Sequence, residues 1–311
     1  MNSSSLTTQT LLSSCKLCPR QCGVNRLHGQ LGYCGEPAEI FAARASLHFW
    51  EEPCISGTSG SGTVFFSGCN LRCVFCQNYE IASDRQGKAI STARLSEIYL
   101  ELQEKGANNI NLVTPTHYIP QIIESLSNAK KQGLTLPIVY NTSGYEEVSS
   151  LMLLEGLIDV YLPDMKYLSP KLSARLSHCP DYFEKASKAL LEMNRQVGKP
   201  VFDEKNGLMK RGMIIRHLVL PGQIGESKRV LRWIHDTFGD QVYVSIMSQY
   251  TPMPNVLSDP AYSDIAREVT PQEYQRVLTF ADKIGIELGF RQEGGVAKES
   301  FIPPFTGEGL I

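Results

Sequence analysis

The stretch GCNLRCVFCQN, residues 68–78, places Cys69, Cys73 and Cys76 within eight residues, with the spacing C-x3-C-x2-C. Three thiols this close together leave one unpaired in any disulfide framework, but they can hold a metal ion or an iron–sulfur cluster. A cubane cluster has four irons, which four cysteines normally bind. Three cysteines would leave one iron open to a small molecule, as three protein ligands leave an open position on a catalytic zinc.

The composition predicts a protein that binds neither nucleic acid nor a membrane. Its 311 residues are 42% hydrophobic and carry a net charge of -2. The charges are dispersed, with no long basic run for nucleic acid, and no apolar stretch is long enough to span a membrane. Nine cysteines and a first segment unlike a secretory signal favour a reducing compartment, so we expect a cytoplasmic protein.

The cysteines also suggest how the chain is organised, because eight of the nine precede residue 77. We expect a disordered lead over residues 1–14 and a cysteine-rich N-terminal segment over residues 15–55. A βα region over residues 56–255 and a C-terminal helix and tail over residues 256–311 should follow.

The βα region alternates apolar, strand-like runs with stretches of helical periodicity. Runs this apolar are typical of strands buried on both faces of a parallel sheet. The expected strands cover residues 63–67, 109–114, 137–141, 158–163, 213–220 and 241–248. The expected helices cover residues 92–105, 118–132, 145–155, 170–197, 226–238 and 271–284. Six strands are fewer than the eight of a closed barrel, so the predicted fold is α/β, a partial (β/α)6 barrel.

Each predicted strand ends in polar residues, on the edge of the sheet where the cysteine loop also begins. Chemistry in such folds sits at the carboxyl ends of the strands. Any one of these residues is more often a helix cap or a solvated loop residue. Their convergence beside the cysteine loop nevertheless favours a binding site. The candidates are Thr116, Asn141, Thr142, Ser143, Asp164, Lys166 and Arg216.

These motifs resemble the radical S-adenosylmethionine (SAM) superfamily, whose cluster loop has this cysteine spacing and an aromatic residue where Phe75 stands. Residues 62–222 resemble the pyruvate formate-lyase activating enzymes, through NTSGY (141–145), DMK (164–166) and RHLVLPG (216–222). LCPRQCGVNR (17–26) and EEPCISG (51–57) resemble the PflX-like branch. The resemblance implies a three-cysteine 4Fe-4S cluster and SAM contacts by Phe75 and the candidates above.

Two positions differ from the activating enzymes. Those enzymes usually carry Gly-Gly-Glu after the second strand, whereas this chain has Thr114-Pro115-Thr116-His117. We expect Thr116 or nearby backbone carbonyls to replace the missing acceptors. Asn141 stands where an acidic residue is common in the activating enzymes.

A second cysteine group lies near the N-terminus. Cys15, Cys18 and Cys22 have the spacing C-x2-C-x3-C, and Cys34 follows. Four thiolates can complete a tetrahedral zinc site or a cubane cluster. We therefore expect an auxiliary cluster or a zinc site here, with free thiols as the alternative. The roles of Cys54 and His117 stay open.

The resemblance implies an enzyme that receives an electron from flavodoxin or ferredoxin and cleaves SAM to a 5′-deoxyadenosyl radical. That radical would abstract hydrogen from a substrate. One alternative substrate is a backbone glycine of a glycyl-radical enzyme, and another is a small molecule or peptide. A hypothesis of a different class is a non-catalytic iron–sulfur or zinc protein that senses redox state.

Overall fold

The computed structural model describes residues 3–292 and 303–311, and a mixed sheet forms its centre. Six parallel strands make up the middle of the sheet and follow one another in the order of the chain. They are β2 (Ser61–Phe66), β4 (Ile110–Val113), β5 (Ile138–Thr142), β6 (Val160–Pro163), β8 (Met209–Leu218) and β9 (Tyr243–Met247). All six predicted strands are therefore confirmed.

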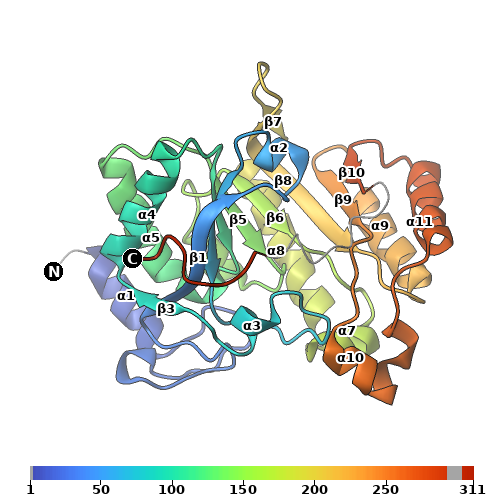
Figure 1. Cartoon of the computed structure of the whole chain (residues 1–311), viewed down its shortest axis with the longest axis horizontal. Helices are drawn as coiled ribbons and strands as arrows, with labels where there is room; N and C mark the ends of the chain where they lie inside the picture. Colours follow the sequence, from blue (N-terminus) through green and yellow to red (C-terminus); the bar gives the residue numbers. More distant parts are fainter. Residues whose placement is uncertain (1–2, 293–302) are drawn as a thin grey trace.

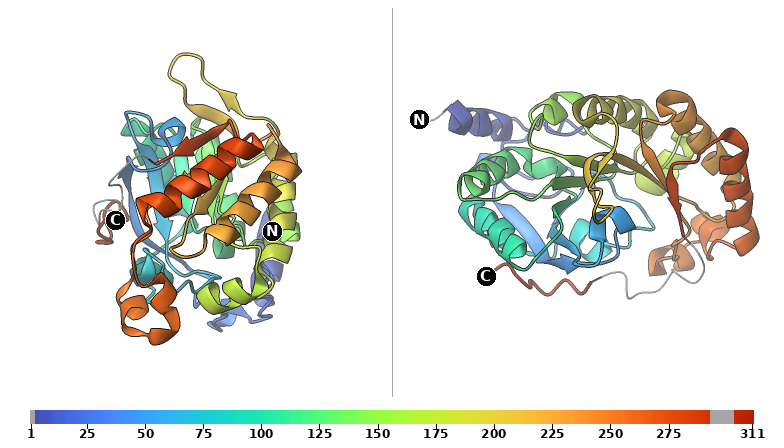
Figure 2. Two further views of the ribbon diagram at one scale, coloured as in Figure 1. Left: turned by 90° about the vertical axis from the view of Figure 1, so that its right-hand side faces the viewer. Right: turned by 90° about the horizontal axis from the view of Figure 1, so that it is seen from above.

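The parallel strands form an arc with the long helices on its outer face (Figure 2). These helices are α4 (Thr92–Glu104), α5 (Ile119–Lys131), α8 (Tyr182–Val197), α9 (Ile224–Phe238) and α11 (Pro271–Ile284). Every residue of β2, β4, β5 and β6 is buried, which explains their apolar sequences. The end strands of the described sheet do not pair with each other, so the arc stays open as the predicted partial barrel.

The outer strands of the sheet were not predicted. On one side, β1 (Ile40–His48) pairs antiparallel with β2, and β3 (Lys88–Ile90) pairs antiparallel with β1. At the other side, β10 (Gly289–Arg291) runs parallel to β9, and the short β7 (Val201–Phe202) pairs with β8. The strand β1, within the segment expected over residues 15–55, thus belongs to the main sheet.

The predicted helix over residues 170–197 is wrong, because the chain breaks it into α7 (Pro170–Ser177) and α8. His178 adopts a left-handed conformation with φ of 50° and ends α7. Pro180 follows two residues later, and proline both lacks an N–H and disfavours helical backbone in the residue before it. The predicted helix over residues 145–155 is shortened to α6 (Val148–Met152).

The two ends of the described chain are ordered against the body of the protein. The lead expected to be disordered instead forms α1 (Ser3–Ser13), in which Leu12 is buried. Residues 303–311 lie beside β1 (Figure 1), where Gly307 N–H donates to Ala43 O at 2.9 Å. Likewise Ala45 N–H donates to Glu308 O at 2.8 Å.

The remaining elements are short. They are α2 (Pro53–Ser56), α3 (Tyr79–Ala82), α10 (Pro254–Ser258), η1 (Arg26–His28), η2 (Thr116–Tyr118) and η3 (Pro260–Ile265). Among the described helices, none has the length and apolar character that crossing a membrane requires.

Candidate functional site

A cavity of about 250 Å³ lies at the carboxyl ends of the parallel strands, where the loop after β2 begins. It joins the three cysteines of this loop to side chains at the ends of five other parallel strands, β4, β5, β6, β8 and β9. Of the predicted site residues outside the N-terminal cysteine group, all but Thr116 line it: Cys69, Cys73, Phe75, Cys76, Asn141, Thr142, Ser143, Asp164, Lys166 and Arg216. The structure therefore brings the predicted site together.

Hydrogen bonds hold the cysteine loop in place. Leu71 N–H donates to Cys69 Sγ at 3.3 Å, and Ser177 Oγ donates to Cys73 Sγ at 3.0 Å. Val74 N–H donates to the carbonyl of Leu176 at 2.9 Å, so the loop is tied to the last turn of α7. Donors to sulfur stabilise a thiolate or a cluster ligand, and these two are already in position.

Burial governs the protonation of the three loop thiols. It raises the pKa of Cys76 to about 12, and the neighbouring Cys73 adds to the rise. Burial also raises the pKa of Cys69 and of Cys73. Thiols with such pKa values stay protonated at neutral pH, so binding of a metal or cluster must displace their protons.

Opposite the thiols, buried charges form a continuous network. Arg216 Nε donates to Asp164 Oδ1 at 3.0 Å, and Lys166 Nζ donates to Asp164 Oδ2 at 2.5 Å. Arg216 Nη2 donates to Asn141 Oδ1 at 2.6 Å. The side chains of Arg216 and Asp164 are each 15% exposed, so water screens the network only weakly.

The network keeps its members charged. Burial alone would raise the pKa of Asp164, but the cations of Lys166 and Arg216 outweigh burial and lower it. Burial would lower the pKa of Lys166, but Asp164 reverses this and raises it. The cavity therefore presents two fixed cations beside the Asp164 carboxylate, which suits a ligand with both a carboxylate and hydroxyl groups.

Glu51 is a member of this network that the sequence did not reveal. It follows β1, far from the strand ends in sequence, yet its Oε2 lies 3.3 Å from Arg216 Nη1. Its Oε1 accepts from Asn141 Nδ2 at 3.1 Å and from Asn111 Nδ2 at 2.9 Å. It thus places a carboxylate beside Asn141, where the activating enzymes commonly have their own acid. Only the pairing of β1 with β2 brings it there.

Thr116 does not face the cavity, contrary to the prediction. It is buried in η2, and its hydroxyl donates to Glu146 Oε1 at 2.6 Å. Thr142 donates to the same carboxylate. The residue of this loop that does line the cavity is Thr114, whose φ of 59° is unusual for a β-branched side chain.

His117 and Cys54, whose roles the sequence left open, are both buried and make structural contacts. His117 is buried, and its Nε2 bonds the carbonyl of Ser67 at 2.7 Å, just before the cysteine loop. Cys54 packs in a buried apolar cluster with Val139, Val160 and Ile214, and it does not line the cavity.

The four N-terminal cysteines lie in a loop that packs against the first cysteine loop. Arg20 Nε donates to Asn70 O at 2.9 Å, and Arg72 Nη2 donates to Tyr33 O at 3.1 Å. Burial raises the pKa of Cys18 to about 12, with further contributions from the nearby Cys34 and Cys15. Among the described residues, no three Cys, His, Asp or Glu side chains converge as ligands of one metal ion do, and this includes the three cysteines of the cavity.

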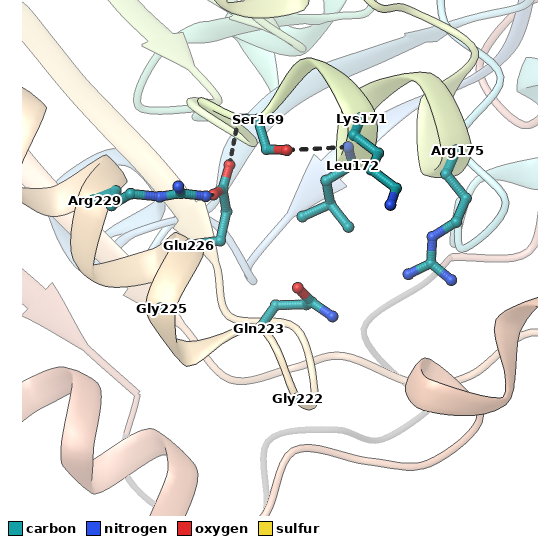
Figure 3. A pocket seen from close by; sticks show the side chains of 9 residues that line it. All are labelled: Ser169, Lys171, Leu172, Arg175, Gly222, Gln223, Gly225, Glu226 and Arg229. Carbon is teal, nitrogen blue, oxygen red and sulfur yellow. Dashed lines mark hydrogen bonds and ion pairs between the residues drawn. The ribbon is translucent and has the colours of Figure 1, made fainter.

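A larger cavity, of about 770 Å³, lies outside the site, between the first turns of α7 and α9 (Figure 3). Lys171, Arg175 and Arg229 line it, together with Glu226. The buried Glu226 carboxylate accepts the Ser169 N–H at 2.7 Å. Despite its size, this cavity contains none of the thiols, so we assign the functional site to the smaller one.

The cavity brings three thiols and a charged network together at the edge of an open parallel α/β sheet. This arrangement is typical of enzymes that combine an iron–sulfur cluster with a small polar cofactor. Residues 63–234, just over half of the chain, match the family model of the radical SAM superfamily. The chain belongs to the radical SAM superfamily. Membership implies an enzyme that uses a 4Fe-4S cluster and SAM, so the non-catalytic sensor hypothesis is not supported. The thiols and charges of the cavity fit both groups.

Two comparisons place the chain among known proteins. It is 30% identical over 290 residues to an uncharacterized protein of Methanocaldococcus jannaschii, covering 90% of this chain and 78% of that one. Its fold is similar to that of SuiB from Streptococcus suis, solved with the precursor peptide SuiA, with a TM-score of 0.50 and 15% identity. That match covers 74% of this chain and 47% of SuiB, so the chain spans about half the length of SuiB.

The buried network predicts a stability effect for Arg216→Ala. The change leaves Asp164 and Glu51 without their shared cation, so the free energy of unfolding should fall by roughly 3–5 kcal/mol. Arg211→Ala, on the same strand but exposed, is the matched control and should change it by less than about 0.5 kcal/mol. Urea denaturation of the two variants and the wild type measures this. Equal losses in both variants would show that the network does not stabilise the fold.

Glu146 predicts a pH dependence. Burial raises its pKa to about 7, against the hydrogen bonds from Thr116, Thr142 and Tyr140. The raised pKa means that its contribution to stability is full below about pH 4.5 and is lost as the pH rises through about 7. The loss should amount to roughly 3 kcal/mol. Glu146→Gln cannot titrate. The free energy of unfolding of the wild type, measured by urea denaturation, should therefore fall relative to that of Glu146→Gln between pH 5 and pH 8. Parallel pH profiles would contradict the assignment.

Proposed function

We propose that this protein cleaves SAM reductively at a 4Fe-4S cluster held by Cys69, Cys73 and Cys76, and that the resulting radical abstracts hydrogen from a substrate. The observation that carries the proposal is that one cavity contains these three thiols and the network of Arg216, Asp164 and Lys166. When bound, the cluster supplies the electron that breaks a carbon–sulfur bond of SAM and yields methionine and the 5′-deoxyadenosyl radical.

The residues of the chain would bind and orient SAM. Arg216 and Lys166 offer positive charge to its carboxylate, and Asp164 offers acceptors to the ribose hydroxyls. Asn141, Thr142 and Ser143 supply further polar groups at the end of β5. Apolar side chains, among them Phe75, Leu218 and Met247, also line the cavity and limit the access of water.

The proposed substrate is a glycine of a glycyl-radical enzyme, on which the activating enzymes act. The resemblance of NTSGY, DMK and RHLVLPG to those enzymes supports this. Trp50 lines the cavity while 56% exposed, and an exposed aromatic side chain beside the site suits a peptide loop. Modification of a small molecule or of another peptide is the second candidate. The proposed place of work is the cytoplasm.

The proposal predicts SAM cleavage by the reconstituted, reduced protein without oxygen. Equimolar methionine and 5′-deoxyadenosine should form, and SAM should change the electron paramagnetic resonance spectrum of the reduced cluster. With a glycyl-radical enzyme deuterated at glycine, deuterium should appear in 5′-deoxyadenosine by mass spectrometry. Cleavage without deuterium transfer would favour the second candidate, and an unchanged spectrum without cleavage would contradict the proposed function.

Asp164→Asn tests the SAM site, because it keeps the shape of the side chain and removes its charge. It should weaken SAM binding by roughly 10- to 100-fold, since hydrogen bonds to charged groups contribute about 1.5–3 kcal/mol. Its iron content should match that of the wild type. Asp203→Asn, just after β7 and outside the cavity, should leave both quantities unchanged.

We also propose that the electron donor, a flavodoxin or ferredoxin, docks on the basic cavity between α7 and α9. Three of its lining side chains are cations, on a chain whose net charge is -2. Arg229 pairs with Glu226 and Arg175 with Asp264, so Lys171 supplies the net positive charge of this surface. Helix α7 runs from this cavity to Ser177, whose hydroxyl donates to Cys73 Sγ. The span from Ser169 to Ser177 is only about 12 Å. An acidic donor here would lie near the cluster loop.

Charge reversal tests this docking. Lys171→Glu with Arg229→Glu should slow reduction by flavodoxin by roughly tenfold at low salt, because it removes the steering of an acidic partner. Reduction by dithionite should be unchanged. Lys130→Glu with Lys131→Glu, in the exposed last turn of α5, is the matched control and should alter neither rate. Equal rates for both double variants with flavodoxin would exclude this docking surface.

A further inference from the structure

The N-terminal loop that contains Cys15, Cys18, Cys22 and Cys34 is folded back on itself. Cys15 N–H donates to Val24 O and Gly23 N–H donates to Cys15 O, both at 2.9 Å, which brings Cys22 back beside Cys15. Gln21 N–H donates to Cys18 O at 3.0 Å and closes a tight turn between them.

Cys34 joins this group from the far end of the loop. Tyr33 N–H donates to Cys22 Sγ at 3.2 Å, so the residue next to Cys34 already contacts one of the other thiols. Cys15 and Cys34 are both near enough to Cys18 for their charges to act on its thiol. The backbone therefore gathers all four thiols into one small region.

A buried arginine beside these thiols is the second, independent observation. Arg26 is only 1% exposed, and its guanidinium donates to the carbonyls of Pro37 and His117 at distances between 2.5 and 3.1 Å. Its Nη1 also lies 4.0 Å from Cys15 Sγ. Within residues 3–292 and 303–311, no carboxylate forms an ion pair with it.

A buried cation without a counter-charge is costly. Carbonyl oxygens satisfy the N–H groups of Arg26, but they carry no net charge to balance it. Thiolates that bind a metal centre do carry that charge, and Cys15 is the nearest of them. The position of Arg26 thus points to a negatively charged group among the four cysteines.

A cluster and a zinc ion require different spacings of their four thiols. Four sulfurs at about 2.3 Å from one zinc lie within roughly 4 Å of each other. No such convergence on a single ion is found in the described part of the chain. The sulfurs around a cubane stand further apart, because four irons and four sulfides lie between them. Cys69, Cys73 and Cys76, in the loop that fits a cubane, likewise do not converge on a single ion.

The N-terminal loop also fits closely against the cluster loop. Gly68 has a φ of 78°, and a Cβ there would lie 2.9 Å from Cys34 O and would clash with Glu36 Cγ. The guanidinium of Arg20 stacks on the Tyr33 ring, 3.9 Å from its centre, while its Nε bonds Asn70 O. Only glycine permits this approach of the two loops.

We propose that Cys15, Cys18, Cys22 and Cys34 bind a second 4Fe-4S cluster, fully ligated by cysteine and adjacent to the cluster loop. This site does not depend on the proposed SAM chemistry. With all four irons bound by the protein, it has no open position for SAM.

Iron analysis of two complementary variants tests this proposal. After anaerobic reconstitution, the wild type should bind about eight irons, and Cys69→Ala/Cys73→Ala/Cys76→Ala should retain about four. The spectrum of the reduced triple variant should not respond to SAM. Cys18→Ser/Cys34→Ser should lose the N-terminal irons while keeping a SAM-responsive signal. Cys54→Ala, which changes a thiol outside both groups, is the control and should bind as much iron as the wild type.

Three results would overturn the proposal. The first is that the Cys69→Ala/Cys73→Ala/Cys76→Ala variant binds no iron, and the second is that it binds about one zinc instead. The third is that the four N-terminal thiols react with a thiol reagent in the reconstituted native protein. If Cys18→Ser/Cys34→Ser does not fold, the triple variant still decides, because its N-terminal cysteines are intact. A SAM-inactive protein whose triple variant retains about four irons would reject the proposed function and support the second cluster.

Discussion

The buried cation of Arg216 is the constraint around which the site is built. Asp164, Asn141 and Glu51 reach it from β6, β5 and the segment after β1, so three separate parts of the chain must be correctly placed before its charge is balanced. A charge that is 15% exposed tolerates little displacement of its partners. The network that could receive SAM therefore also fixes the register of the strand ends that form the cavity. Binding and folding depend on the same side chains here.

The parallel core of the fold could be predicted from the sequence because its signals are local. Strands buried on both faces are apolar throughout, and the helices between them have clear periodicity and caps such as the Thr270–Glu273 capping box. The antiparallel β1 and β3 were missed because partly exposed strands have no continuous apolar run. The break between α7 and α8 was readable from Pro180 and was overlooked.

The residues of the candidate site could likewise be predicted where their signal is local. Cys69, Asp164 and Arg216 could be predicted because each directly follows or ends a recognisable strand, and strand ends of a parallel sheet meet at one edge. Glu51 could not, because its position depends on the long-range pairing of β1 with β2. Thr116 was misplaced because the loop turns its side chain into the core, where its hydroxyl bonds the carboxylate of Glu146, and Thr114, two residues earlier, lines the cavity instead.

The strand β1 is bordered on one side by β2 and on the other by β3 and residues 303–311. Pro303, at the start of this segment, also lines the cavity. The backbone hydrogen bonds of Ala43 and Ala45 to this segment therefore hold part of the cavity wall in place. Before the segment docks beside β1, that part of the wall is missing and the thiols are more accessible than in the finished fold. Delivery of iron and sulfide would be easiest at that stage.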